Sequence, residues 1–205
     1  MTRLSEEFFD RPVLQIAPEL LGCVVTHAGV SVRLTEVEAY DGANDPGSHA
    51  FRGRTPRNAS MFGPAGTLYV YFTYGMHFCC NIGCGPEGIA SAVLLRAGEV
   101  MAGHDLARQR RGRSTDRDLA RGPARLAQAM ALGRDQDGLY TPDPDCAMSV
   151  EPRSQQGRPA VRTGPRVGLS GPGGNGATYP WRFWLDGETS VSAYRPAKPR
   201  RPRAT

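Results

Sequence analysis

The stretch GTLYVYFTYGMHFCCNI, residues 66–82, carries the strongest indication of the fold. Two runs rich in aromatic and β-branched residues, 67–72 and 77–82, lie on either side of Gly75. Such runs favour β-strands, and glycine supplies the backbone freedom that a tight hairpin needs. The pattern therefore predicts two antiparallel strands joined by a short turn.

The register of this hairpin determines which side chains share a face. A turn centred on Met76 would place Tyr71 opposite Asn81, with both side chains on the same face. Tyr74 would then project from the tip. Because side chains alternate along a strand, Tyr69 and Tyr71 would lie on one face and their neighbours on the other. Two readings remain open: the rings pack within the protein, or one face presents them to a ligand.

Further elements surround the hairpin. Residues 32–40 predict a strand in which Glu36, Glu38 and Tyr40 share one face. Residues 41–62 form a long loop, and loops of this length in compact domains are usually functional or disordered. Residues 88–97 predict a strand that ends at Arg96. The sequence Gly122-Pro123-Ala124 predicts the start of a helix that runs through Leu132.

The distribution of charge indicates an anionic partner more clearly than the net charge does. The chain has 205 residues, with 25 Lys and Arg against 20 Asp and Glu. Its formal excess of +5 comes from the basic, Pro-rich tail 195–205, and the remainder is formally neutral. Residues 46–86 contain no Asp or Glu but carry three arginines, two histidines and most of the aromatic run. Clustered basic and aromatic residues are typical of nucleic-acid-binding surfaces.

Length and composition predict one domain, residues 1–194, followed by a tail, 195–205, that is expected to be disordered. No apolar run approaches the roughly 20 residues of a membrane span. The charged N-terminus lacks the apolar core of an export signal. The odd number of cysteines, five, favours reduced thiols. These features together predict a cytoplasmic protein that does not bind a membrane.

Glu38 is the first candidate for chemistry. It can be read as a solvated strand carboxylate or as a general base beside Tyr40. Burial against rings would raise its pKa, whereas a nearby arginine would lower it. A glycosidase-like carboxylate pair with Glu36 is also conceivable, because residues two apart on a strand lie about 6.6–7 Å apart. We favour a single base.

A metal site is a weaker interpretation. His77, Cys79, Cys80 and Cys84 supply only half of a structural zinc spacing. Adjacent cysteines on a strand point to opposite faces, so buried apolar thiols are the better account. No metal or cofactor is therefore expected. A non-catalytic nucleic-acid-binding module and a thiol–metal structural protein remain alternatives to an enzyme.

A series of short motifs is similar to those of one known family. The motifs are Thr35-Glu-Val-Glu-Ala-Tyr40, Ser48-His49-Ala-Phe-Arg52, Arg54-Thr-Pro-Arg-Asn58, Met61-Phe62, Gly66-Thr-Leu-Tyr-Val-Tyr71, Tyr74-Gly-Met-His77, Asn81 and Val93-Leu-Leu-Arg96. They resemble the alkyladenine (3-methyladenine) DNA glycosylase family. The resemblance covers residues 8–194 and is densest between 34 and 96. It implies an α+β fold: a single mixed domain with a curved, mainly antiparallel β-sheet, peripheral helices and a protruding β-hairpin.

The resemblance also implies an activity. The family members are monofunctional DNA glycosylases of base-excision repair, which flip damaged purines out of double-stranded DNA. Alkylated or deaminated bases such as 3-methyladenine, ethenoadenine or hypoxanthine are the implied substrates. Hydrolysis of the N-glycosidic bond by a Glu-activated water leaves an abasic site. The implied enzyme is a monomer without cofactor, metal or obligate protein partner.

The family's functional residues map onto positions of this chain. Glu38 matches the general base, and Arg96 matches a residue that holds that site. Tyr40, His49 and Tyr71 match the walls around the flipped base, and Asn81 matches a gate against certain exocyclic amino groups. Tyr74 matches the residue that wedges into the minor groove. The expected DNA contacts are Met76, His77, Arg57 and Arg125.

Two positions depart from the mammalian pattern. His77 stands where mammalian members carry a phenol, next to the hairpin tip. Arg125 stands where a phosphate-contacting lysine is expected, and arginine binds phosphate with a different geometry. The range of lesions is therefore the inference that the resemblance supports least.

Overall fold

The computed structural model describes residues 3–154 and 159–197, whose strands form one sheet. The strands are β1 (Val24–His27), β2 (Val30–Asp41), β3 (Leu68–Thr73), β4 (His77–Cys84), β5 (Ser91–Ala102), β6 (Ser149–Glu151), β7 (Val161–Gly164) and β8 (Arg182–Leu185). They follow the order β3-β4-β5-β2-β1-β6, and β8 pairs with both β2 and β7. These pairings are antiparallel. The expected α+β fold on an antiparallel sheet is therefore confirmed.

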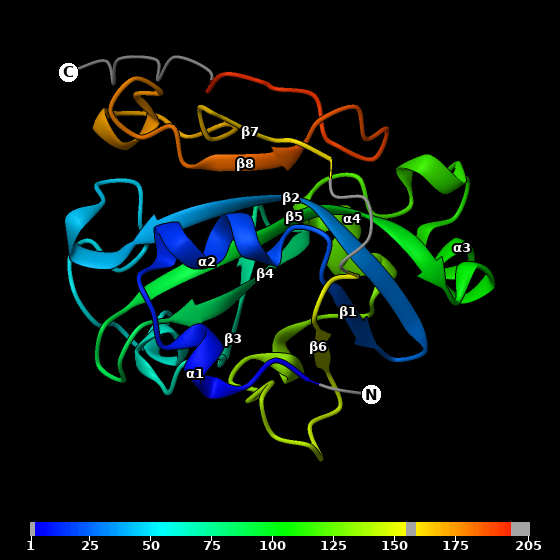
Figure 1. Cartoon of the computed structure of the whole chain (residues 1–205), viewed down its shortest axis with the longest axis horizontal. Coiled ribbons are helices and arrows are strands. Elements are labelled where there is room, and N and C mark those ends of the chain that lie inside the picture. Colours follow the sequence, from blue (N-terminus) through cyan, green and yellow to red (C-terminus); the bar gives the residue numbers. More distant parts are fainter. Residues whose placement is uncertain (1–2, 155–158, 198–205) are drawn as a thin grey trace.

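Short helices surround the sheet (Figure 1). They are α1 (Glu6–Phe9), α2 (Val13–Leu20), α3 (His104–Arg111) and α4 (Pro123–Ala129), with 3₁₀ turns at Gly42–Asn44, Ala59–Phe62, Asp116–Asp118, Arg134–Gln136 and Pro172–Gly174. α2 buries residues at helical spacing against β2 and β5. α4 packs on β4, β5 and α3. Among the described residues, no helix has the length and apolar character needed to cross a membrane.

Helix α4 begins at Pro123, as expected, but ends earlier than predicted. Ala131 adopts a positive φ of 53°. The N–H of Leu132 donates to the carbonyl of Ala127 at 2.8 Å. A left-handed residue with this hydrogen bond closes a helix, so Leu132 lies beyond the helix rather than in it.

Strand β2 is the centre of the sheet. It pairs with β5 along most of its length on one side. On the other side its first half pairs with β1 and its second half with β8. Figure 1 shows β8 beside this second half, with β7 on the far side of β8. All residues of β2 from Leu34 to Ala39 are buried, so both faces of the strand are enclosed there. Glu36 and Glu38 lie in this segment.

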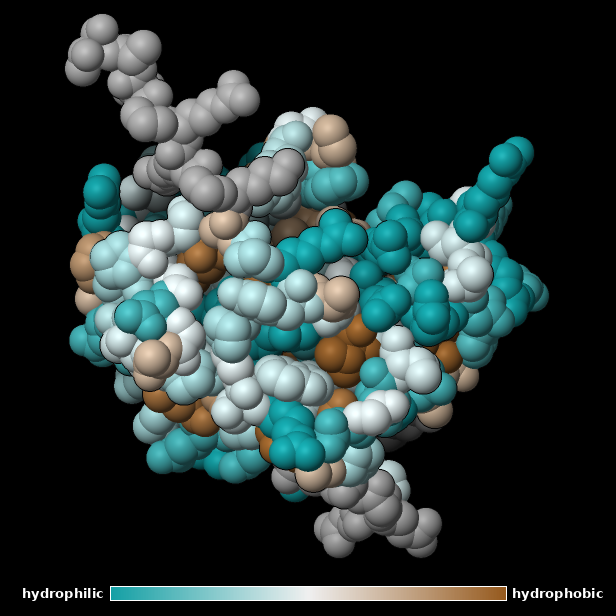
Figure 2. Space-filling view, turned by 90° about the horizontal axis from the view of Figure 1, so that it is seen from above, coloured by the Kyte–Doolittle hydropathy of each residue, from teal (hydrophilic) through white to brown (hydrophobic). Residues whose placement is uncertain are grey.

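The surface above β7 and β8 is polar. Seen from above in Figure 2, it is mainly hydrophilic, and its hydrophobic residues occur in separate patches. Patches of this kind are ordinary on a soluble surface.

Strand β5 corrects one expectation. It continues to Ala102 instead of ending at Arg96. Opposite it, Glu36 pairs with Ala97 and Val37 with Leu95, so Arg96 is left without a partner on β2. Such a β-bulge re-aims a side chain and is frequent next to active sites. Arg96 therefore sits at a break in the ladder, between the two glutamates.

The hairpin exists as predicted, but its register is different. Thr73 pairs with His77, Tyr71 with Cys79 and Tyr69 with Asn81, so the turn is centred on Gly75 rather than on Met76. Tyr74 and Gly75 both have positive φ, 51° and 67°, which closes the turn earlier. The expected pairing of Tyr71 with Asn81 was wrong. The correction moves the pairing by two residues, so their side chains keep the same face.

Candidate active site

A pocket of about 340 Å³ opens between the sheet and the loops that follow β2 and β7. Its lining includes seven residues singled out from the sequence: Glu38, Tyr40, His49, Tyr71, Tyr74, Asn81 and Arg96. They come from β2, the 41–62 loop, the hairpin and β5. The remaining candidates, Arg57, Met76, His77 and Arg125, do not line it. The fold thus separates an inner group from an outer group of predicted site residues.

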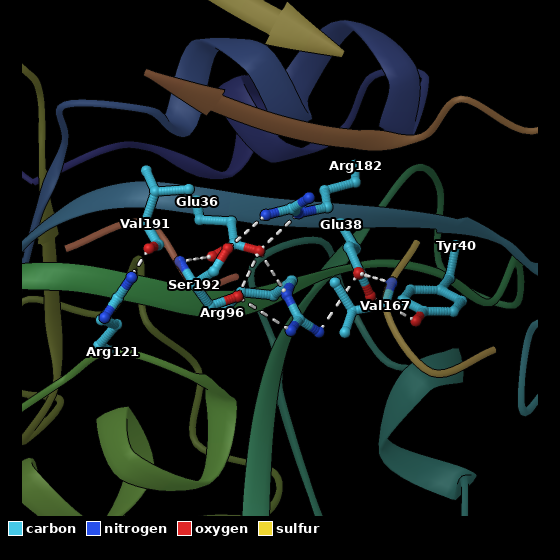
Figure 3. Close-up of polar contacts among 9 residues, drawn as sticks. All are labelled: Glu36, Glu38, Tyr40, Arg96, Arg121, Val167, Arg182, Val191 and Ser192. Atoms are coloured by element: carbon cyan, nitrogen blue, oxygen red, sulfur yellow. Dashed lines mark hydrogen bonds and ion pairs between the residues drawn. The ribbon is translucent and has the colours of Figure 1, made fainter. Parts of the chain in front are cut away.

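The carboxylate of Glu38 forms part of the pocket wall and is fully buried. Oε1 accepts a hydrogen bond from the backbone N–H of Val167 at 2.7 Å and lies 3.3 Å from Nη1 of Arg96. Oε2 accepts one from the hydroxyl of Tyr40 at 2.8 Å (Figure 3). A carboxylate has about four acceptor positions. Among the described residues three are used, so one position on Oε2 has no protein donor.

Glu36, two residues earlier, is also fully buried but does not line the pocket. Its Oε1 accepts hydrogen bonds from Arg96 Nε at 2.8 Å, Arg182 Nε at 2.7 Å and Ser192 Oγ at 2.9 Å. Its Oε2 accepts one from the backbone N–H of Ser192 at 2.7 Å. Burial raises the pKa of Glu36, but the two guanidinium groups outweigh it and the pKa is lowered. Glu36 is therefore a charged anchor that holds four hydrogen bonds outside the pocket.

Arg96 connects the two glutamates. Its Nε binds Glu36 and its Nη1 lies against Glu38, and the side chain is 7% exposed. Burial lowers the pKa of Arg96, but the two carboxylates raise it by more than burial lowers it, so the net shift is upward. The solvated-carboxylate reading of Glu38 is thus wrong in this fold. A carboxylate pair acting from both glutamates is disfavoured, because Glu36 does not line the pocket.

Aromatic rings form the walls of the pocket. His49 meets Tyr71 edge-on, with ring centroids 4.6 Å apart. Tyr71 stacks on Tyr69 at 5.4 Å. Burial, followed by the charge of Arg57, lowers the pKa of His49. Burial also raises the pKa of Tyr69 to about 12 and raises that of Tyr40 well above its usual value. The walls are therefore uncharged, electron-rich rings near neutral pH.

Tyr69 is a wall residue that the sequence placed on one face with Tyr71, but it was not among the predicted site residues. It is 1% exposed, and its hydroxyl lies 3.1 Å from Nδ1 of His49. Its backbone carbonyl accepts a hydrogen bond from the side-chain amide of Asn81 at 3.1 Å. Tyr69 thereby orients two of the expected pocket residues. The alternation of Tyr69 with Tyr71 was the signal that could have identified it.

A second group of residues was missed because it is distant in sequence. Arg166 donates to both oxygens of Asp45, at 2.5 and 2.7 Å, and its guanidinium lies 4.5 Å from the centre of the Tyr40 ring. Its neighbour Val167 donates to Glu38. None of the motifs quoted from the sequence includes Arg166, Val167 or Asp45.

The outer candidates are exposed side chains, and Tyr74 lies with them at the hairpin tip although it also borders the pocket. Tyr74 is 84% exposed and Met76 is 68% exposed at the hairpin tip, and His77 follows them on the exposed end of β4. Arg57 is exposed, and its guanidinium lies 5.8 Å from the Tyr71 ring centre. Arg125 is exposed on α4, 3.8 Å from Asp118. Their contacts with DNA stay predictions.

The cysteines do not form a metal centre in the part of the chain that the structure describes, where no three His, Cys, Asp or Glu side chains gather around a common point. Cys79, Cys80 and Cys84 are buried. Burial raises the pKa of each thiol, and metal binding requires the thiolate. The thiol–metal alternative therefore has no site here.

Comparisons with known proteins identify the family of this chain. The family model for methylpurine-DNA glycosylase matches residues 7–189. A protein of Streptomyces avermitilis named "Putative 3-methyladenine DNA glycosylase" is 54% identical to this chain. The match covers 98% of this chain and 96% of the Streptomyces protein. Proteins with the same name from Frankia casuarinae and Leifsonia xyli subsp. xyli are 50% and 53% identical, over 96% and 89% of this chain and 94% and 88% of their own. The expected family and enzyme class are confirmed: the chain belongs to the methylpurine-DNA glycosylases, hydrolases that act on N-glycosyl bonds.

Proposed function

We propose that this chain hydrolyses the N-glycosidic bond of damaged purines flipped out of double-stranded DNA, with Glu38 as the general base. The observation that carries the proposal is the open acceptor position on Glu38 Oε2 inside an aromatic-walled pocket. A water bound there would donate one hydrogen bond to the carboxylate. A positioned base of this kind contributes roughly 10²–10⁴-fold to a rate.

The proposed step balances as follows. The water oxygen forms a bond to C1′ of the nucleotide, and its proton passes to Glu38. The bond between C1′ and the purine nitrogen breaks, and its electron pair leaves with the base. An alkylated purine that carries a positive charge departs neutral, whereas a neutral lesion such as hypoxanthine needs a proton from solvent or a weak acid. Arg96, held by Glu36, fixes the carboxylate during this step.

The walls of the pocket suit such a base. Tyr40 and His49 lie around the space next to Tyr71. Electron-rich rings attract a cationic base by cation–π interaction, worth roughly 0.5–2 kcal/mol. Asn81, oriented by its hydrogen bond to the Tyr69 carbonyl, is placed to test the exocyclic groups of the purine. These contacts support alkylated and deaminated purines as the substrates.

The hairpin supports recognition of a duplex. Tyr74 is almost fully exposed at the tip and also borders the pocket. A ring in that position can enter the stack and fill the space of the extruded nucleotide. Flipping costs a few kcal/mol, and less for a damaged or mispaired base.

The described lining of the pocket supports a monofunctional reaction. A glycosylase that also cuts the strand needs an amine to form a Schiff base with the sugar. The only lysine of the chain is Lys198, which lies outside the described residues. Among the described residues that line the pocket there is no lysine, which supports water as the nucleophile.

An excision assay tests the proposal. Duplex oligonucleotides carrying ethenoadenine, hypoxanthine or 3-methyladenine are incubated with the protein and EDTA, then treated with alkali. We expect strand cleavage only after alkali, at the lesion, and none in the undamaged duplex. Tight lesion binding without cleavage would favour the non-catalytic binding module. Cleavage before alkali would contradict a monofunctional enzyme, and inhibition by EDTA would contradict a metal-free reaction.

A further inference from the structure

The buried pair of Arg166 and Asp45 lies directly behind the pocket. Both side chains are fully buried, and the two guanidinium nitrogens Nη1 and Nη2 bind the two carboxylate oxygens. Nη1 also donates to the carbonyl of Ala39 at 2.9 Å, and Nη2 to that of Gly173 at 2.8 Å. A buried ion pair often adds little to stability over an apolar replacement. Stability alone therefore does not explain why an ion pair is buried at this position.

Arg166 contacts the strand that carries the base. Ala39 stands between Glu38 and Tyr40, so the hydrogen bond to its carbonyl holds the backbone between these two residues. The guanidinium lies on the face of the Tyr40 ring, 4.5 Å from its centre. The same phenol donates its hydroxyl proton to Glu38. Arg166 thus fixes both the ring and the backbone on which that hydrogen bond depends.

Arg166 also fixes the two loops that close the pocket. Asp45 Oδ1 accepts the backbone N–H of Gly47 at 2.8 Å, and Gly47 lines the pocket two residues before His49. On the other side, the residue after Arg166 is Val167, whose N–H donates to Glu38. The space around Gly47 is closed: an added Cβ would come within 2.7 Å of Arg166 Nη2. One guanidinium therefore joins β2 and both loops.

We propose that Arg166, held by Asp45, is a positioning residue that orients the Glu38 carboxylate and the Tyr40 ring for excision. The proposal rests on the proposed function. It predicts a defect in the chemical step rather than in lesion binding. Small displacements of catalytic groups, of about 1 Å, can lower a rate about 10²-fold. Lysine keeps the charge but not the planar fork, so Arg166→Lys separates geometry from charge.

The test compares Arg166→Lys with Arg3→Lys. Arg3 is a matched control because its guanidinium, like that of Arg166, binds backbone carbonyls. They are those of Thr141, Met148 and Cys146, which do not line the pocket. Single-turnover excision of ethenoadenine is measured for each variant and normalised to the folded fraction. Lesion affinity is measured in the Glu38→Gln background. We expect Arg166→Lys to lower excision ten- to a hundredfold with less than a threefold change in affinity, and Arg3→Lys to change neither.

A second variant, Asp45→Asn, keeps the size of the side chain but places a donor against the guanidinium. We expect excision to fall at least threefold, again with unchanged affinity. Normal excision by either folded variant, or equal losses of excision and affinity, would overturn the positioning role. Failure of both variants to fold would also overturn it, since the pair would then serve folding itself. Wild-type protein that leaves the lesion intact would instead refute the proposed function.

Discussion

Glu36 and Glu38 lie two residues apart on the same strand and face, and both are fully buried, yet their surroundings differ. Glu36 accepts four hydrogen bonds, from Arg96, Arg182 and two groups of Ser192, and does not line the pocket. Glu38 accepts two hydrogen bonds, lies against Arg96 and forms part of the pocket wall. The two carboxylates therefore differ in their access to the pocket.

The segments that cover the two residues produce this difference. Three consecutive residues, Ser190 to Ser192, close over Glu36, and each is anchored. Ser190 bonds Thr35 at 2.8 Å, the carbonyl of Val191 accepts from Arg121 at 2.8 Å, and Ser192 binds Glu36 itself (Figure 3). Over Glu38, the covering segment contributes a single backbone N–H and then turns away to border the pocket. The chemistry available to a carboxylate thus depends on how many donors its cover supplies.

The largest expected effect comes from Glu38→Gln. Excision should fall about 10²–10⁴-fold because the amide cannot accept the proton of the water. Lesion affinity should persist, because the pocket walls remain. Single-turnover excision and a gel shift measure the two quantities, with Glu99→Gln, an exposed carboxylate on β5, as control. Normal turnover by the variant would sink the assignment of Glu38.

Glu36→Gln should act on the fold instead. Removing this charge leaves the buried Arg182 without its anion and leaves the buried Arg96 with Glu38 alone. Breaking a buried pair in this way destabilises by about 3–5 kcal/mol. Urea unfolding measures the loss, and excision per folded molecule should fall less than for Glu38→Gln. A variant as stable as the wild type, but inactive, would reverse the roles of the two glutamates.

Tyr40→Phe sharpens the comparison by removing one donor from Glu38. Hydrogen bonds to charged groups are worth about 1.5–3 kcal/mol, so we expect excision to fall about tenfold. Tyr140→Phe is a matched control, because Tyr140 also donates to a glutamate, Glu6, but outside the pocket. Equal excision by the two variants would show that the Tyr40 hydroxyl is dispensable.

The smallest effect is expected in the pH dependence of stability. The pKa of Glu36 is lowered in the folded protein, so its contribution is fully present above its unfolded pKa. It is lost as the pH falls below about 4.5 and through the folded pKa, with a slope of at most roughly 1.4 kcal/mol per pH unit. Urea unfolding between pH 6 and 3 measures the free energy of unfolding. It should fall more steeply with falling pH for the wild type than for Glu36→Gln, by this slope. Parallel curves would mean that Glu36 is not held as an anion.

Much of the inner site was predictable from neighbouring residues. Alternation placed Glu38 with Tyr40, and the hairpin pattern placed Tyr71 with Asn81 on one face, because the side-chain period of a strand is local. The exact register was not predictable. It depends on the positive φ of Tyr74, a conformation that non-glycine residues rarely adopt. The length of β5 was also missed, because the bulge at Arg96 is set by pairing with β2 rather than by its own residues.

The sequence by itself determined the family, the antiparallel hairpin and the residues most expected to act on DNA, since these follow from short motifs and local periodicity. Only the tertiary structure decided which glutamate lines the pocket. The donors of Glu36 include Arg182 and Ser192, far along the chain, and those of Glu38 include Val167, which follows Arg166. Hydrogen bonds between distant segments form only when the sheet brings them together, so no local pattern encodes them.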